Sequence, residues 1–314
     1  MRLLLTGLIG LNMAFLAPVP YIPVRTQSLP GSSNPDTCRS GNLLHGRPSE
    51  VLPPRHSFFA PDYNPRDSFL FLEKQQNAAR HTYRSVRALA IARSFIGTPY
   101  VTGTLDLNAS EQLVVNLRQL DCWTLVENCV AIAMTQEGDF TTYLSYLQQL
   151  RYWGGTVDGY GSRIHYFTGW LLQAEKNGIL YDRTREMGGI PYQKKVGYIS
   201  ARREKYPKIK DANILRDIKA AEKRINAHQW YYIPKSKVAG IEHLIQEGDL
   251  VILTSSRRDL DVAHQGFAVR QNGRIHLLNA SSLSKRVVIS RQNLVQYLAS
   301  QKGQSGIMVA RLFD

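Results

Sequence analysis

The sequence of 314 residues is poor in cysteine, with only Cys38, Cys122 and Cys129. Three cysteines do not make a disulfide framework. If Cys122 and Cys129 share one helix, seven residues of helical rise separate them by about 10 Å, which is too far for a disulfide. Cys38 lies in a different region of the chain. A cysteine kept reduced for chemistry therefore fits the count better than structural bridging.

Several motifs that mark common enzyme and binding classes are also absent. The sequence has no H-E-x-x-H motif and no close His/Glu cluster, so nothing indicates a metal site. It lacks the G-x-S-x-G elbow of serine hydrolases and the glycine-rich loops of nucleotide-binding proteins. No long basic run is interleaved with aromatic residues, which argues against nucleic acid as a partner. We therefore expect neither a metal nor another cofactor.

The charge balance, in contrast, is strongly basic. Lysine and arginine exceed aspartate and glutamate by 39 − 25 = 14. Such a balance favours anionic partners, for example a membrane surface, a cell-wall polymer or a carboxylate-rich substrate. General solubility explains the same charge, because the basic residues are scattered in short clusters such as Arg257-Arg258.

The N-terminal part of the chain differs from the rest. The apolar run over residues 3–16 is short for a membrane span and suits the central region of a signal peptide, which we place at residues 1–23. Export to the periplasm follows, with a membrane-tethered N-terminus as the alternative. Residues 24–66 are rich in Pro, Ser, Asn and Arg and are predicted to form an arm. Residues 67–314 are then one folded domain.

Hydrophobic periodicity within that domain predicts a mixture of helices and strands. The expected helices cover residues 68–96, 122–135, 138–150, 164–177 and 213–227. The expected strands cover residues 230–234, 250–253, 264–270 and 275–280, with a strand or brief helix at 113–117. This order favours the α+β class.

The segment 120–133 has the clearest helical pattern. Its apolar and small residues recur on one helical face, at Cys122, Leu125, Val126, Cys129, Val130 and Ala133. Asp121 stands just before this series and is a good N-cap residue. Cys122 is then the first helical residue, where free backbone N–H groups and the helix dipole stabilise a thiolate. An acylating cysteine needs that environment, whereas Cys129 belongs to the core face.

A second feature supplies a base. Asn-Gly at 272–273, between two apolar runs, predicts a β-hairpin with a two-residue type I′ turn. Paired residues then sum to 272 + 273 = 545, so Asn279 faces Gly266 and lies diagonal to His264 on one sheet face. A histidine oriented by an amide is half of a Cys-His-Asn arrangement. The separation of 264 − 122 = 142 residues from Cys122 matches the spacing in papain-like enzymes.

These features stand among further blocks of residues that occur in a fixed order. The blocks are Gly97-Thr98-Pro99-Tyr100 with Gly103-Thr104-Leu105, Leu113-Val114-Val115-Asn116-Leu117, Asp121-Cys122-x-Thr124-x-Val126-Glu127, Gly159-Tyr160-x-Ser162-Arg163-x-His165-Tyr166-Phe167, Gly248-Asp249, Leu260-Asp261-Val262-x-His264-x-Gly266, and Asn279-Ala280-Ser281. Together they resemble the DUF1460 family, called N-acetylmuramoyl-L-alanine amidase-like, a branch of the bacterial NlpC/P60 cysteine peptidases. The resemblance covers about residues 70–312.

The resemblance implies a rearranged papain-like NlpC/P60 domain of the α+β class over residues 67–314, with the nucleophile helix packed on an antiparallel sheet. It implies hydrolysis of an amide in peptidoglycan fragments, in the first place the bond between N-acetylmuramic acid and L-alanine. Cys122 carries over as the nucleophile and His264 as the general base. The third position, usually a histidine in this family, is Asn279 here. An amide can orient the imidazole, although it cannot carry charge.

Four more residues are predicted to contact substrate. The hydroxyl of Tyr100 is expected near the site, and Ser162, Arg163 and His165 belong to a glycine-rich loop. An arginine in that loop suits the carboxylates of a stem peptide. Two other functions stay open: cleavage between D-glutamate and the diamino acid of the stem, and a catalytically silent module that binds cell wall through its +14 charge. In each case peptidoglycan is the partner, and no stable membrane span is expected.

Overall fold

Residues 60–314 are the part of the chain that the computed structural model describes. The helices are α1 (Pro65–Ala78), α2 (Arg84–Ser94), α3 (Cys122–Met134), α4 (Phe140–Arg151), α5 (Phe167–Lys176), α6 (Ala212–Ala227), α7 (Val238–Ile241) and α8 (Leu294–Ser300). The strands are β1 (Asp62–Tyr63), β2 (Val114–Val115), β3 (Leu180–Asp182), β4 (Ile190–Pro191), β5 (Tyr231–Pro234), β6 (Leu250–Ser255), β7 (Val262–Gln271), β8 (Arg274–Ser281), β9 (Arg286–Asn293) and β10 (Gln304–Leu312).

The expected signal peptide and the arm up to residue 59 lie outside the described residues. The last residues of the expected arm are part of the fold, because β1 pairs with β2 and α1 begins at Pro65. The folded domain therefore begins before residue 67. None of the helices in residues 60–314 combines the length and the apolar character that crossing a membrane requires.

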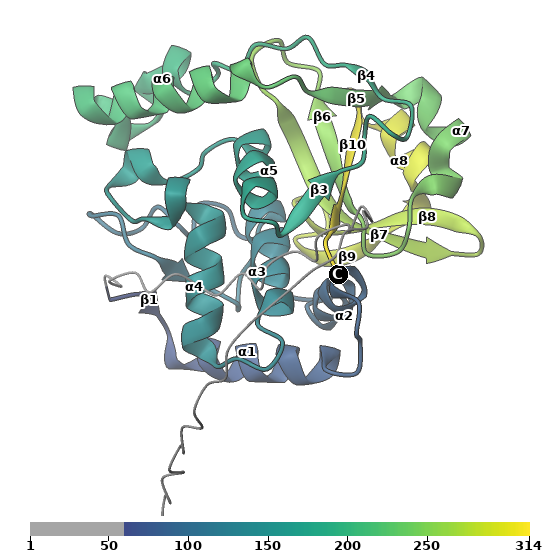
Figure 1. The fold of residues 1–314 in the computed structure, drawn as a ribbon, viewed down its shortest axis with the longest axis horizontal. Coiled ribbons are helices and arrows are strands. Elements are labelled where there is room, and N and C mark those ends of the chain that lie inside the picture. The colour runs from purple at the N-terminus through teal and green to yellow at the C-terminus, as the bar shows by residue number, and fades with distance from the viewer. Residues whose placement is uncertain (1–59) are drawn as a thin grey trace, which may run out of the picture. The chain divides into compact units, whose positions relative to one another are not determined.

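An antiparallel sheet of eight strands organises the domain. Seven strands follow the order β4-β5-β10-β6-β7-β8-β9, and β3 pairs with β10 beside them. Helices α1 to α5 gather on one side of this sheet, and α7 and α8 lie toward the other (Figure 1). Side chains alternate accordingly: Phe267 belongs to the larger apolar cluster, on the α3 side, while its neighbour Ala268 belongs to the smaller one. The expected mixture of helices with an antiparallel sheet is thus confirmed.

The β7–β8 hairpin has the predicted register. Phe267 pairs with Leu278 and Gln271 with Arg274, so each pair sums to 545. Asn272 and Gly273 both have positive φ, at 49° and 78°, as a type I′ turn requires. The short turn therefore fixes which residues of the two strands share a face.

Other predictions were less complete. The single helix expected over 68–96 is two helices, α1 and α2, separated by residues 79–83. Strands β9 and β10 and helix α8 were not predicted, although β10 lies inside the sheet between β5 and β6. Within β9, burial does not follow a clean alternation, since three successive residues from Val288 to Ser290 are half-buried. The alternation of apolar and polar residues by which a strand is predicted from sequence is therefore weak in β9.

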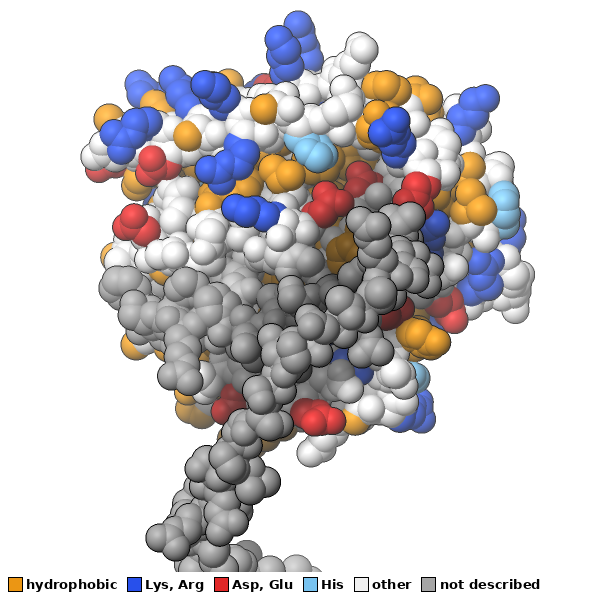
Figure 2. All heavy atoms as spheres, viewed as in Figure 1, with side chains coloured by type: hydrophobic (Ala, Val, Ile, Leu, Met, Phe, Trp, Pro, Cys, Tyr) orange, Lys and Arg blue, Asp and Glu red, His pale blue; other side chains and the backbone are white. Residues whose placement is uncertain are grey.

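Helix α6, which was expected over residues 213–227, is amphipathic. Its buried residues are Ile218, Ala221, Glu222 and Ile225, which repeat at three- and four-residue intervals. The opposite face carries lysines and arginines. Figure 2 shows Lys and Arg side chains over the upper part of this view, where α6 lies in Figure 1.

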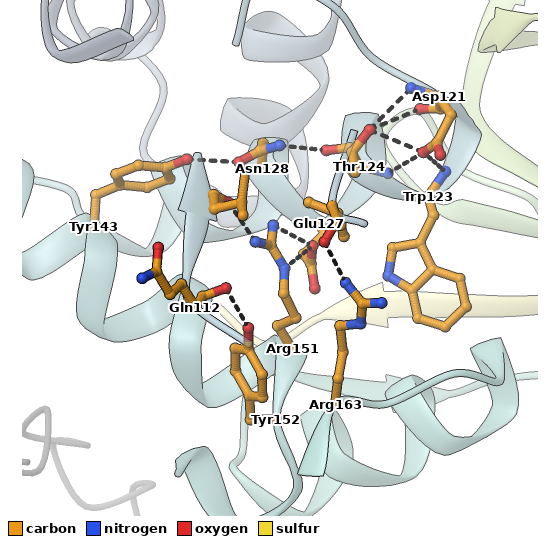
Figure 3. Close-up of polar contacts among 12 residues, drawn as sticks. Gln112, Asp121, Trp123, Thr124, Glu127, Asn128, Tyr143, Arg151, Tyr152 and Arg163 are labelled. Carbon is orange, nitrogen blue, oxygen red and sulfur yellow. Dashed lines mark hydrogen bonds and ion pairs between the residues drawn. The ribbon is translucent and has the colours of Figure 1, made fainter. Parts of the chain in front are cut away.

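A buried ion pair joins the helix that carries Cys122 to its neighbour. Arg151, at the end of α4, donates from Nε and Nη2 to one carboxylate oxygen of Glu127 on α3, at 2.9 and 2.7 Å (Figure 3). Its Nη1 also donates to the carbonyl of Val114 in β2. Both charged side chains are excluded from solvent. Breaking such a pair strands one charge in the interior.

We therefore expect Arg151→Met to lower the free energy of unfolding by about 3–5 kcal/mol, because Glu127 would stay buried without its partner. Arg93→Met is the matched control: it breaks the Arg93–Glu247 pair, whose side chains are 42% and 46% exposed. The control should change stability by less than about 1 kcal/mol. Urea unfolding followed by circular dichroism measures the free energy of unfolding of both variants. Equal losses in the two variants would contradict the claim that the buried Arg151–Glu127 pair stabilises the contact between α3 and α4.

Candidate active site

Asp121 caps the N-terminus of α3, as predicted. One carboxylate oxygen accepts from the backbone N–H groups of Trp123 and Thr124, at 3.0 and 2.8 Å. The hydroxyl of Thr124 accepts from the N–H of Asp121 at 2.9 Å, which completes a capping box (Figure 3). The N–H of Cys122 precedes the groups that this cap uses, and it forms no hydrogen bond to another residue among residues 60–314. That donor is available to a ligand.

Cys122 is the first residue of α3 and is partly exposed, whereas Cys129 is fully buried. Burial, and then the nearby Asp121 carboxylate, raises the pKa of the Cys122 thiol to about 12. The backbone amides of Gln265, Cys122 and Trp123 lie close enough to lower this pKa, but they do not outweigh burial. The amides at the helix start thus act in the direction that the sequence indicated, but burial acts more strongly. Helix-terminus amides alone do not compensate for the loss of solvent around sulfur, and the group rests as a neutral thiol.

His264 and Asn279 are hydrogen-bonded, as the hairpin register predicted. Nε2 of His264 lies 2.9 Å from Oδ1 of Asn279, which is 2% exposed. Nδ2 of Asn279 donates to the carbonyl of Leu277 at 3.1 Å, so Oδ1 is the atom turned toward the ring. Nε2 then carries the proton, and Nδ1 keeps its lone pair. Within the described chain, Nδ1 has no hydrogen-bond partner.

The charge state of His264 follows from its surroundings. Burial lowers the pKa of His264 below its usual 6.5, while the hydrogen bond that Nε2 donates to Asn279 and the nearby Asp121 carboxylate act in the opposite direction. The imidazole is therefore neutral at pH 7 and able to accept a proton. The Asp121 carboxylate that caps α3 acts on both the thiol and the imidazole.

The fold brings these groups together without a direct bond between them. The amide of Gln265, next to His264 on β7, approaches the sulfur of Cys122, and Asp121 influences both Cys122 and His264. No hydrogen bond joins Cys122 to His264 among the described residues. Catalytic contacts are often long in the absence of substrate and tighten when it binds.

Tyr100 lies beside the start of α3. Tyr100 forms an isolated parallel β-bridge with Leu120, and its backbone N–H donates to the carbonyl of Lys285 at 2.9 Å. Residues 97–100 thus connect the start of β9 to the residues that precede Cys122. Burial, and then the proximity of Cys122 and Asp121, raises the pKa of Tyr100 to about 12. Its hydroxyl therefore stays protonated near the sulfur. The predicted contact between this hydroxyl and the substrate stays a proposal.

Tyr297 is a residue near the site that the sequence did not indicate. It belongs to α8, and burial followed by the proximity of Cys122 raises its pKa. It also lines a groove of about 490 Å³ together with Asn279 and Arg286. Tyr297 lies 175 residues after Cys122 (297 − 122), on a helix that was not predicted, so no local signal marked it.

The three side chains of the glycine-rich loop that were predicted to contact substrate form hydrogen bonds within the protein instead. Arg163 is 5% exposed; it donates to the carbonyl of Leu105 and forms ion pairs with Asp106 and Glu111. Its guanidinium thereby ties the loop to residues 105–111. The expected contact between Arg163 and substrate carboxylates is therefore not supported, because the guanidinium is already engaged.

The other two loop residues are also bonded locally. The hydroxyl of Ser162 donates to Gly159 and accepts from the N–H of Asp158. Nε2 of His165 lies 2.8 Å from the carbonyl of Tyr160, and burial lowers the pKa of His165 to about 3. His165 is therefore uncharged at neutral pH. Neither Ser162 nor His165 has a hydrogen bond to Cys122 or His264 in the part of the chain that is described.

Comparisons with known proteins identify the family of the chain. Residues 90–307 match the AmiA-like family, described as N-acetylmuramoyl-L-alanine amidase-like. An N-acetylmuramoyl-L-alanine amidase from Bacteroides uniformis is 32% identical in sequence, with a TM-score of 0.69, over 72% of this chain and 99% of its own. No curated protein matches the chain.

Two further solved structures are similar. A candidate xylanase from Bacteroides fragilis is 33% identical, with a TM-score of 0.67, over 70% of this chain and 98% of its own. A Legionella pneumophila protein of the DUF1460 family is 20% identical, with a TM-score of 0.63, over 80% of this chain and 94% of its own, which shows a shared fold. Because residues 90–307 of this chain, well over half of its length, match the family, the chain belongs to the N-acetylmuramoyl-L-alanine amidase-like family.

Proposed function

We propose that the protein is a cysteine amidase that hydrolyses the bond between N-acetylmuramic acid and L-alanine in peptidoglycan fragments, acting outside the cytoplasm. The observation that carries the proposal is the hydrogen-bonded pair His264–Asn279 beside Cys122 at a capped helix start. A histidine oriented by an amide, with a cysteine at a helix start, is the set of side chains that a papain-like enzyme uses. The NlpC/P60 type of that fold is part of the same proposal.

Acylation follows from the two charge states. Because the pKa of Cys122 is raised and that of His264 is lowered, no ion pair forms before substrate binds. Nδ1 of His264 takes the thiol proton as sulfur attacks the lactyl carbonyl of muramic acid. The resulting oxyanion accepts from the unpaired N–H of Cys122, and such a donor contributes about 3–4 kcal/mol to the transition state in comparable enzymes.

The second half of the reaction returns the site to its starting state. The imidazolium of His264 gives its proton to the amine of the leaving L-alanine, which frees the stem peptide. A water molecule then loses a proton to His264 and attacks the thioester carbonyl on Cys122. The C–S bond breaks, the muramic acid leaves as a carboxylic acid, and the sulfur takes the proton back from His264. Throughout, Asn279 holds the ring in one orientation through Nε2. The net change is hydrolysis of one amide, with no oxidation or reduction.

A glycosidase reaction fits the site less well. Hydrolysis of a glycosidic bond generally uses two carboxyl groups on either side of the bond. The carboxylate next to Cys122 belongs to Asp121, and its oxygen is occupied by two backbone N–H groups and the hydroxyl of Thr124. The residues around His264 therefore offer a base and a nucleophile, which suit attack on an acyl group. They do not offer the two carboxyl groups that glycoside hydrolysis generally uses.

We expect Cys122→Ala to reduce hydrolysis of muropeptides by roughly a thousandfold or more, because the nucleophile is removed. Cys129→Ala is the matched control, since Cys129 lies on the same helix but in the core. The Cys129→Ala protein should retain activity when it is assayed at a temperature at which it is fully folded. Mass spectrometry of the digest identifies the bond: free stem peptide supports the proposal, whereas truncated stems indicate cleavage after D-glutamate.

Activity should also depend on pH through His264. Since its pKa lies below 6.5 and the neutral form is the base, kcat/KM should be constant near pH 7 and fall only as the pH drops below that range. Asn279→Asp places a negative charge against the ring, which raises the pKa of His264 by about one to three units and moves the acid limb to higher pH.

The control for this profile is His276→Gln. His276 is on the same hairpin, but its ring bonds the carbonyl of Ser290 instead of Asn279. It should leave the acid limb unchanged. An acid limb that does not move in Asn279→Asp would show that His264 is not the group that titrates.

A further inference from the structure

A basic cavity lies beside the loop that leads into β7. It has a volume of about 780 Å³ and is lined by four cationic side chains, Lys195, Arg202, Arg257 and Arg258, and by the acidic Asp259. Arg257, Arg258 and Lys195 are exposed to solvent, while Arg202 and Asp259 are half-buried. The cavity is therefore open and strongly positive.

Its charges are not balanced by the protein. Arg202 pairs with Asp259 at 2.5 Å, and this hydrogen bond holds the pKa of Asp259 below its usual range. One acid against four cations leaves three positive charges. No carboxylate within residues 60–314 forms an ion pair with Lys195, Arg257 or Arg258. A cavity that keeps three uncompensated cations favours an anionic ligand.

The loop that presents the two arginines is held in place. The ammonium group of Lys194 donates to the carbonyls of Ser255, Arg257 and Leu260, so it fixes both ends and the middle of the loop. The N–H of Gly197 donates to the carbonyl of Asp259 at 3.0 Å. The backbone under the cavity is thus organised before a ligand arrives, which reduces the entropy lost on binding.

The same loop is connected to the active site. Asp261 accepts from the N–H and the hydroxyl of Thr168 at the start of α5, at 2.9 and 2.7 Å. The neighbouring Phe167 packs edge-on against Trp123, the residue after the proposed nucleophile. Arg258 and His264 are six residues apart, so their Cα atoms lie within about 20 Å. A four-residue stem reaches about 14 Å when extended, and the arginine side chain covers much of the remaining distance.

We propose that this cavity binds the free carboxylates of the stem peptide, on the leaving-group side of the cleaved amide. The proposal rests on the proposed function, and it gives to Arg257, Arg258 and Lys195 the role that Arg163 does not fill. Guanidinium groups bind carboxylates through paired hydrogen bonds, so an arginine pair suits a peptide that carries several acids. The substrate class is then a fragment whose stem carboxylates are free rather than amidated or cross-linked.

Binding to protein carrying Cys122→Ala tests this without hydrolysis. The probes are N-acetylmuramoyl tetrapeptide and the same compound with its carboxylates amidated, each titrated calorimetrically. Arg257→Gln with Arg258→Gln should weaken binding of the free acid about tenfold and leave the amidated compound unaffected. Arg80→Gln with Lys176→Gln removes the same charge from exposed positions outside the cavity and should change neither affinity.

The two proposals fail in different ways. If both double variants weaken the free acid equally, or if the amidated compound binds as well as the free acid, the cavity is not a carboxylate site, even when the unaltered protein cleaves muropeptides. If the free acid binds selectively but the unaltered protein cleaves nothing, the carboxylate site stands and the amidase reaction is wrong. Replacement of both arginines by lysine should restore part of the affinity, because charge is kept while the paired geometry is lost.

Discussion

The cap that Asp121 forms on α3 is the interaction on which the site depends. Its carboxylate takes the N–H groups of Trp123 and Thr124, so Cys122 is held at the helix start and its own N–H is left without a partner. The same negative charge raises the pKa of the Cys122 thiol and acts to raise that of His264. One side chain thus positions the sulfur, leaves the N–H of Cys122 available to the oxyanion of the proposed reaction, and influences the pKa values of both Cys122 and His264.

Burial decides the charge state of the pair. A sulfur and an imidazole in a solvent-poor site are both more stable when neutral, which pushes the pKa of Cys122 up and that of His264 down. In the proposed mechanism, the sulfur of Cys122 therefore stays unreactive until substrate and base are aligned. Asn279 suits this regime, because an amide orients the ring without adding a charge that the site would have to balance.

The parts of the fold that depend on local chemistry could be predicted from the sequence. The Asn272-Gly273 turn needs only positive φ at two residues, and it set the register that places Asn279 against His264. The start of α3 needs only a capping side chain at Asp121. Both features depend on residues within a few positions of each other, so their physical cause is visible in the sequence.

The remainder depends on contacts between distant segments. Arg163 looked free in its loop, but its partner Asp106 lies 57 residues earlier in the chain. At Cys122 the pattern shows the helix start, which favours a thiolate, but not the burial that opposes it. Tyr297 and the cavity at Arg257 likewise arise where segments meet, and no periodicity reports such meetings.

The most direct measurement of the mechanism is a search for the acyl-enzyme. Unaltered protein, mixed with N-acetylmuramoyl peptide and quenched in acid during the first turnover, should carry a thioester, whereas protein carrying His264→Ala should carry none, because the base that takes the thiol proton is missing. Peptide mapping by mass spectrometry should place a muramoyl group on the peptide that contains Cys122. Free stem peptide released with no adduct, or with the adduct on another residue, would contradict Cys122 as the nucleophile.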